Sequence, residues 1–154
     1  MLEEIEKKLQ TQLSKEDYEY IKNKSLHLGI FTEPCLSFML EGKKKIESRF
    51  SKKKILPYQK IKKDDIVLVK KASGKVVAYF TIKEVKFFDL KEIKIEKIKK
   101  EYNQFLCVED SFWVLKKESC YGTLIFIDKI HLLKPFSITK KGMQTWILLG
   151  KIGI

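Results

Sequence analysis

The sequence predicts an α+β protein, in which a small mixed β-barrel is flanked by helices and preceded by a helical extension. Three observations predict this class. Several short apolar stretches alternate as strands do and are bounded by turn residues. Helical spacing is clear in the first 24 residues and recurs in a few later segments. The chain of 154 residues is 44% hydrophobic, which is enough to bury a core within one domain.

Residues 1–24 are predicted to form a helical extension to a domain at residues 25–154. The first helix carries apolar residues at the spacing of one helix face: Leu2, Ile5, Leu9 and Leu13. Ser14 followed by Asp17 is typical of the start of a second helix. We expect the apolar stripe to pack on the barrel. The alternative is that the N-terminal helices bind a protein partner.

The first half of the domain is predicted to alternate between strands and one short helix. Leu26–Ile30 alternates as a strand does. Pro34–Glu41 is expected to be a helix, since proline suits the first helical turn. Lys45–Phe50 is expected to be a second strand. After a turn at Asp64–Asp65, Ile66–Lys70 is expected to be a buried strand.

The second half is predicted to hold the longest strands. Val76–Phe88 is rich in β-forming residues and is expected to bend once. Asp89 and Glu92 are typical of a helix start. Four further elements are predicted: a strand at Phe105–Val108, a short helix capped by Ser111, and strands at Gly122–Leu133 and Thr145–Leu149.

The strand at Lys45–Phe50 follows Gly42 and carries a row of alternating charges. Successive strand residues point to opposite faces, so Lys45, Glu47 and Arg49 share one face. Arg49 is the only arginine among 32 lysine and arginine residues. A guanidinium grips phosphate or carboxylate with two hydrogen bonds, which favours a ligand-binding role. The alternative is a structural pair with Glu47 or another acid.

The spacing of these residues resembles a known family. Gly42, Lys44, Glu47 and Arg49 fill the pattern Gly-x-Lys-x-x-Glu-x-Arg, the signature of ASCH domains, which are relatives of the PUA fold. The order of strand, short helix, signature strand and buried strand is similar too. The resemblance covers roughly residues 25–150. Later stretches resemble the closing strands of bacterial members: Tyr121–Ile127, Pro135–Ile138 and Trp146–Leu149.

The resemblance implies a PUA-like barrel with a cationic cleft that binds RNA or a nucleotide-like ligand. The signature residues would line this cleft, with two neighbouring lysines close by. A basic loop after the strand adds a lysine for phosphate and an aromatic ring for stacking. The expected binding residues are Lys43, Lys44, Lys45, Glu47, Arg49, Lys53 and Tyr58.

The alternative function is a hydrolase acting on RNA or a modified nucleoside, with Lys44 and Glu47 as catalytic residues. One bacterial branch of the resembled family hydrolyses acetylated cytidine. There the signature lysine activates a threonine three residues later. That position is Glu47 here, and the neighbouring Ser48 is expected on the opposite strand face. The departure argues against this particular activity.

Composition sets the remaining expectations. The formal net charge of +12 favours anionic partners, although a lysine-rich surface would also produce it. No apolar run approaches the length of a membrane helix, so a cytoplasmic protein without a membrane partner is expected. Three widely spaced cysteines and two histidines form no metal pattern. Neither a metal nor another cofactor is expected.

Overall fold

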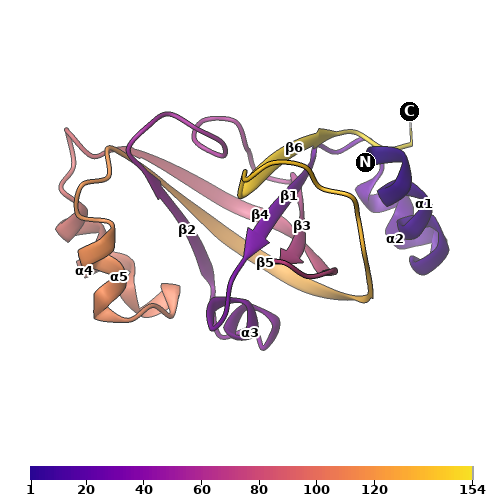
Figure 1. Cartoon of the computed structure of the whole chain (residues 1–154), viewed down its shortest axis with the longest axis horizontal. Helices are drawn as coiled ribbons and strands as arrows, with labels where there is room; N and C mark the ends of the chain where they lie inside the picture. The colour runs from indigo at the N-terminus through magenta and orange to yellow at the C-terminus, as the bar shows by residue number, and fades with distance from the viewer. Residues whose placement is uncertain (154) are drawn as a thin grey trace.

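The computed structural model describes residues 1–153 and folds them around one mixed sheet that forms a half-barrel (Figure 1). Within these residues the sheet has six strands in the order β2-β5-β4-β3-β1-β6. The strands are β1 (Leu26–Phe31), β2 (Ile46–Ser51), β3 (Ile66–Lys71), β4 (Val76–Asp89), β5 (Tyr121–Phe136) and β6 (Trp146–Gly150). The helices are α1 (Leu2–Gln12), α2 (Lys15–Ile21), α3 (Cys35–Leu40), α4 (Ile95–Leu106) and α5 (Asp110–Leu115). The expected α+β class is confirmed.

The topology places β2 and β6 at the two edges of the sheet. β1 pairs with β3 in parallel, and every other pairing is antiparallel. A parallel pair needs a crossover, which α3, β2 and the connection to β3 supply. The long strands β4 and β5 shift register near Phe80 and Ile82. Such irregularities bend a sheet, so these register shifts agree with the expectation that the strand at Val76–Phe88 bends.

Helices close both ends of the sheet (Figure 1). At one end α1 and α2 bury Ile5, Leu9 and Ile21 against the sheet, each at most 1% exposed. The apolar stripe of the first helix is therefore buried within the molecule, as expected. A protein partner would contact the polar face of α1 and α2. At the other end α4 and α5 pack on Ile46 and Phe50 of β2. A third cluster fills the half-barrel between β1, α3 and β4.

Three expectations in the second half of the chain were wrong. The short helix expected to be capped by Ser111 begins at Asp110, with Glu109 at the N-cap position. The expected strand at Phe105–Val108 is the end of α4, because Leu106 continues the buried helix face of Ile98 and Tyr102. The helix also begins at Ile95 rather than near Asp89. The Asp89 carboxylate instead accepts a hydrogen bond from the Lys91 amide in a turn after β4. The capping signal at Asp89 therefore marks a turn between β4 and α4.

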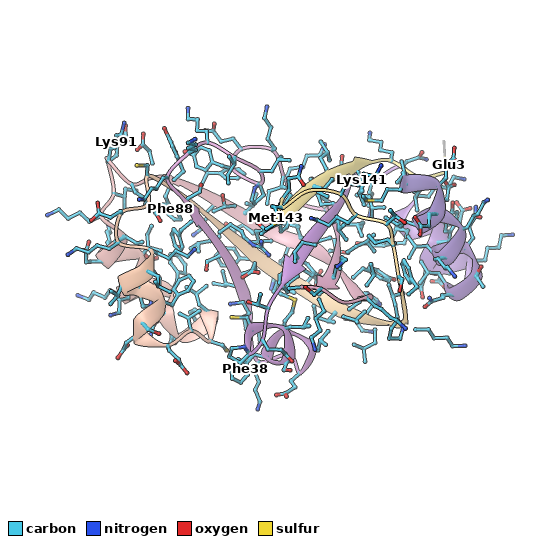
Figure 2. The ribbon with its side chains drawn as sticks, in the orientation of Figure 1. Glu3, Phe38, Phe88, Lys91, Lys141 and Met143 are labelled. Atoms are coloured by element: carbon cyan, nitrogen blue, oxygen red, sulfur yellow. The ribbon has the colours of Figure 1, made fainter. Side chains whose placement is uncertain are left out.

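None of the helices within residues 1–153 has both the length and the apolar character that crossing a bilayer requires. Side chains fill the space between the sheet and its helices, and charged groups ring the outside (Figure 2). Glu3 and Lys91 mark opposite ends of the molecule, near α1 and before α4.

Candidate functional site

Glu47 and Arg49 of β2 contact each other, whereas Lys45, expected on the same strand face, precedes β2 and is exposed. Gly42 ends the α3 segment with a left-handed backbone, φ +77°, which glycine adopts without strain. In β2, Ile46 and Phe50 face the core under α4 and α5. Glu47 and Arg49 occupy the other strand face, toward the half-barrel opening.

Lys44, Glu47 and Arg49 form a chain of charge contacts. The Lys44 ammonium lies 3.6 Å from Glu47 Oε1, and Arg49 Nη2 lies 3.2 Å from Glu47 Oε2. The Glu47 carboxylate also accepts a hydrogen bond from the Ser48 amide at 2.9 Å. The side chains of Lys44 and Glu47 are only 1% and 8% exposed. Two cations and a backbone amide thus compensate one buried carboxylate.

The Lys44 side chain is directed away from solvent toward α4. Its ammonium donates to the Leu106 carbonyl, at the C-terminal end of that helix. Carbonyls at a helix C-terminus lack helical partners and carry partial negative charge, so a cation is favoured there. Lys44 therefore joins α4 to the signature strand.

Arg49 reaches across the opening of the half-barrel. Its Nη2 donates to the Ile30 carbonyl at 2.9 Å and its Nη1 to the Thr145 carbonyl at 3.2 Å. The guanidinium carbon lies 4.8 Å and 5.2 Å from the ring centroids of Phe31 and Trp146. Arg49 on one edge strand therefore holds the region of β1 and β6, the opposite edge of the same sheet.

A pocket of about 280 Å³ opens beside Arg49. Its walls combine aromatic rings, hydroxyls, one carboxylate and two cationic side chains. The contributing segments are the end of β1, α3, β2, the loop after β2, α5, β5 and the start of β6. The lining includes Thr32, Cys35, Glu47, Ser48, Arg49, Tyr58, Phe112, Lys116, Thr123 and Thr145.

Glu47, Arg49 and Tyr58 of the expected binding residues line this pocket. Tyr58 is 9% exposed, and its ring packs on Phe87 and Tyr121. The ring therefore forms part of the pocket wall, with little of its surface free for stacking. Lys44 lies behind the pocket rather than in its lining.

Three expected lysines are absent from the pocket lining. Lys43 is exposed and pairs with Glu41 at 3.0 Å. Lys45 and Lys53 are exposed on the surface. Among the lining residues, cationic character comes from Arg49 and Lys116 and is reduced by Glu47.

Several lining residues were not found from sequence. Thr123 lies directly opposite Arg49 in the β2–β5 ladder, and Thr145 precedes β6. Phe112 and Lys116 arrive from α5, more than sixty residues after the signature. No local pattern marks them, because strand pairing and helix docking bring them here.

Cys35 lines the pocket as a neutral thiol. Burial raises the pKa of Cys35, and the nearby Lys44 ammonium only partly offsets this. A thiol with a raised pKa is a poor nucleophile at neutral pH. Within residues 1–153, no group of three or more histidine, cysteine or acidic side chains is placed to hold a metal ion.

A buried hydrogen-bond chain supports the Trp146 wall. Trp146 Nε1 donates to His27 Nδ1 at 3.2 Å, so Nε2 of a neutral imidazole donates to Asp65 Oδ2 at 2.8 Å. Burial lowers the pKa of His27, and the hydrogen bond and charge of Asp65 oppose this. Asp65 also accepts from the Lys62 amide at 3.1 Å. The chain fixes the Trp146 ring that contacts Arg49.

Comparison with solved structures agrees with this architecture. The structure is similar to that of ASCH from Zymomonas mobilis, with a TM-score of 0.65 over 80% of this chain and 87% of that chain, at 10% identity. A serine-to-alanine variant of that protein aligns with a TM-score of 0.64 over 84% and 91% of the two chains, at 9% identity. The chain therefore has the fold of these ASCH structures. No family model and no curated protein sequence matches the chain.

Proposed function

We propose that the pocket beside Arg49 binds RNA through one nucleotide, or binds a free nucleotide-like ligand. The observation that carries this proposal is the convergence of Glu47 and Arg49 with aromatic walls in one hollow. Ligand pockets are typically apolar concavities with a few placed polar groups. The ASCH-domain fold is consistent with an RNA-binding module.

The size of the hollow favours a small unit as its occupant. A volume of about 280 Å³ is at the lower end of the range for small-molecule sites. A single base or nucleoside suits this space, whereas a duplex does not. Any longer RNA would place one nucleotide inside and leave the rest of the strand outside.

The polar groups of the pocket fit a base with an amino group and a phosphate at the rim. Glu47 Oε2, which already accepts from Arg49, retains acceptor capacity for a base N–H. The hydroxyls of Thr32, Thr123 and Thr145 can donate or accept. Lys116 is half-buried at the pocket wall and would hold a phosphate as a point charge.

A hydrolase using Lys44 and Glu47 is less well supported by the geometry. The Lys44 ammonium is committed to the Leu106 carbonyl and to Glu47, and Lys44 does not line the pocket. A general acid or base must come within hydrogen-bond reach of the reacting group. The binding role requires no such exposure of Lys44.

Neighbouring lysines on α5 provide a matched test. Lys116 lines the pocket, whereas Lys117 lines a separate hollow between α4 and α5. We expect Lys116→Gln to weaken binding of nucleoside monophosphates about 10-fold, since one charge-assisted contact contributes about 1.5 kcal/mol. Lys117→Gln removes the same charge and is expected to leave binding nearly unchanged.

Calorimetric titration with the four ribonucleoside monophosphates measures both variants. Glu47→Gln tests the base contact in the same titration and should alter preference among the four bases. Equal losses of affinity in Lys116→Gln and Lys117→Gln would mean that the effect comes from the overall charge of the protein and not from a contact in the pocket. Absence of binding by the unmodified protein at millimolar ligand would overturn the proposal.

A further inference from the structure

The connection between β2 and β3 is a second basic feature that starts at the pocket and leads away from it. It runs along one edge of the molecule from the end of β2 to the start of β3 (Figure 1). Its first part, Ile55–Tyr58, lines the pocket. Its last part, Lys62–Asp65, lines another hollow of about 300 Å³.

This connection is strongly basic over its whole length. It holds six exposed lysines: Lys52, Lys53, Lys54, Lys60, Lys62 and Lys63. Its acids are Asp64 and Asp65, and the carboxylate of Asp65 is 4% exposed and engaged with His27. Within residues 1–153, none of these six ammonium groups has an ion-pair partner. The positive charge is therefore uncompensated and open to an external anion.

The far hollow adds cations from two other segments. Lys24 comes from the link between α2 and β1, and Lys151 follows β6. With Lys62 and Lys63, four lysines from three parts of the chain surround one concavity. Asp64 and Asp65 line the same hollow, and the Asp65 carboxylate is engaged with His27, so the lining keeps an excess of positive charge. A concave surface with an excess of one charge concentrates counter-ions more strongly than dispersed charges do.

The two hollows lie at opposite ends of β1. Ile30, Phe31 and Thr32 at its C-terminal end line the nucleotide pocket, and Ser25 at its start lines the lysine hollow. The six residues of this strand span about 20 Å at about 3.3 Å per residue. Stacked nucleotides advance about 3.4 Å each, so about six nucleotides bridge the distance.

We propose that the β2–β3 connection binds the phosphodiester backbone of a single strand whose one nucleotide occupies the Arg49 pocket, and that this backbone ends in the lysine hollow. The proposal deepens the proposed function and rests on it for the anchored nucleotide. Lysine contacts to phosphate depend on charge and carry no base preference. The pocket supplies selectivity, and the connection supplies affinity and a length requirement.

Oligonucleotide length and matched lysine variants test the proposal. Fluorescence anisotropy would use labelled single-stranded RNA of two, four, eight and twelve nucleotides, with DNA of the same sequences as a second arm. Affinity is expected to rise steeply up to about six to eight nucleotides and then level off. The triple variant Lys62→Gln, Lys63→Gln, Lys151→Gln removes far-hollow charge. The control Lys94→Gln, Lys97→Gln, Lys100→Gln removes equal charge from exposed positions at α4.

The far-hollow variant is expected to weaken binding of the twelve-nucleotide strand at least 10-fold and to leave mononucleotide binding unchanged. The salt dependence of its binding should become shallower by about two, since each lost phosphate contact on a single strand lowers the slope by about 0.7. Equal effects of the two triple variants on binding of the twelve-nucleotide strand would overturn the proposed backbone contact along the β2–β3 connection. If mononucleotides do not bind but the far-hollow variant still weakens binding of the twelve-nucleotide strand, the nucleotide pocket is refuted and the backbone contact is retained. If DNA of twelve nucleotides binds as tightly as RNA, the site recognises the phosphodiester backbone and does not distinguish ribose from deoxyribose.

Discussion

Arg49 shows how one side chain serves both the fold and the pocket. It connects the edge strand β2 with backbone carbonyls of Ile30 and Thr145 at the opposite edge of the sheet. Of the alternatives that the sequence left open, the pair with Glu47 is present, and pocket lining is present as well. A binding test on Arg49 alone would therefore mix two effects.

We expect Arg49→Ala to lower the free energy of unfolding by about 2–4 kcal/mol, because it removes three charge-assisted hydrogen bonds and leaves Glu47 buried with one cation fewer. Arg49→Lys should recover less than half of this loss, since one ammonium cannot reproduce the planar fork that reaches both carbonyls. Urea denaturation measures both. Exposed Lys45→Ala is the control, expected within about 0.5 kcal/mol. A fully stable Arg49→Lys protein would refute the bridging role.

The pH dependence of stability belongs to His27. Its pKa is lowered in the folded protein by burial, against an ordinary value of 6.5. Below pH 6.5 the unfolded chain takes up a proton that folded His27 does not, so stability falls as pH decreases through this range. The Asp65 carboxylate, which faces the ring, limits the fall by favouring the charged form.

His27→Gln is expected to be less stable at pH 7.5 and to lose less stability on acidification to pH 5.5. The difference in slope can reach about 1.4 kcal/mol per pH unit for one proton. Thermal or urea unfolding at several pH values gives both quantities. Parallel pH curves for the two proteins would show that His27 does not control this dependence.

At the residue scale, the sequence predicted what depends on strand alternation. Glu47 and Arg49 share a face because β2 is a strand, and this needed no tertiary information. The burial of Lys44 could not be predicted, since its partner Leu106 is 62 positions away on α4. No local sequence pattern indicates that Lys44 is buried or that its ammonium contacts the Leu106 carbonyl.

At the scale of elements, Lys44 joins α4 and the signature strand. We expect Lys44→Met to destabilise the protein by about 1–3 kcal/mol, since it leaves the Leu106 carbonyl without its donor and the buried Glu47 carboxylate with one cation fewer. The effect should be concentrated in α4 and α5. Hydrogen exchange followed by mass spectrometry would show faster exchange in residues 95–115 than in α1 and α2. Uniformly faster exchange would mean that Lys44 stabilises the whole sheet instead.

Element prediction succeeded where capping and hydrophobic periodicity agreed. Ser14 caps α2 by accepting a hydrogen bond from the Asp17 amide at 3.0 Å, as expected. It failed near Asp89, where the same type of signal marks a turn after β4. Asp89 itself pairs with Tyr121 of β5 as the last residue of β4, and the helix begins only at Ile95. Tertiary pairing therefore decided which of two similar sequence signals began a helix.

At the scale of the whole molecule, the sequence predicted a mixed barrel but not its open seam. Strand order depends on pairings between distant segments, such as β2 with β5, which no local pattern contains. Side chains stabilise the seam: Arg49 crosses from β2 to the other edge, and Glu47 pairs with the Arg49 guanidinium. The division at residues 24 and 25 stays a prediction, although α1 and α2 contribute to the same core as β1 and β3.

A ligand in the pocket would contact both sides of this seam, because β2 and Thr145, the residue before β6, line the same hollow. We therefore expect a bound nucleotide to slow amide exchange in residues 46–51 and 145–150 together. Ligand at 100 times its dissociation constant should also stabilise the folded state by about 2.7 kcal/mol. Exchange in α1, remote from the pocket, is the internal control and should change only through global opening. Protection of β2 without β6 would mean that the ligand binds one wall of the pocket and leaves the seam as it is.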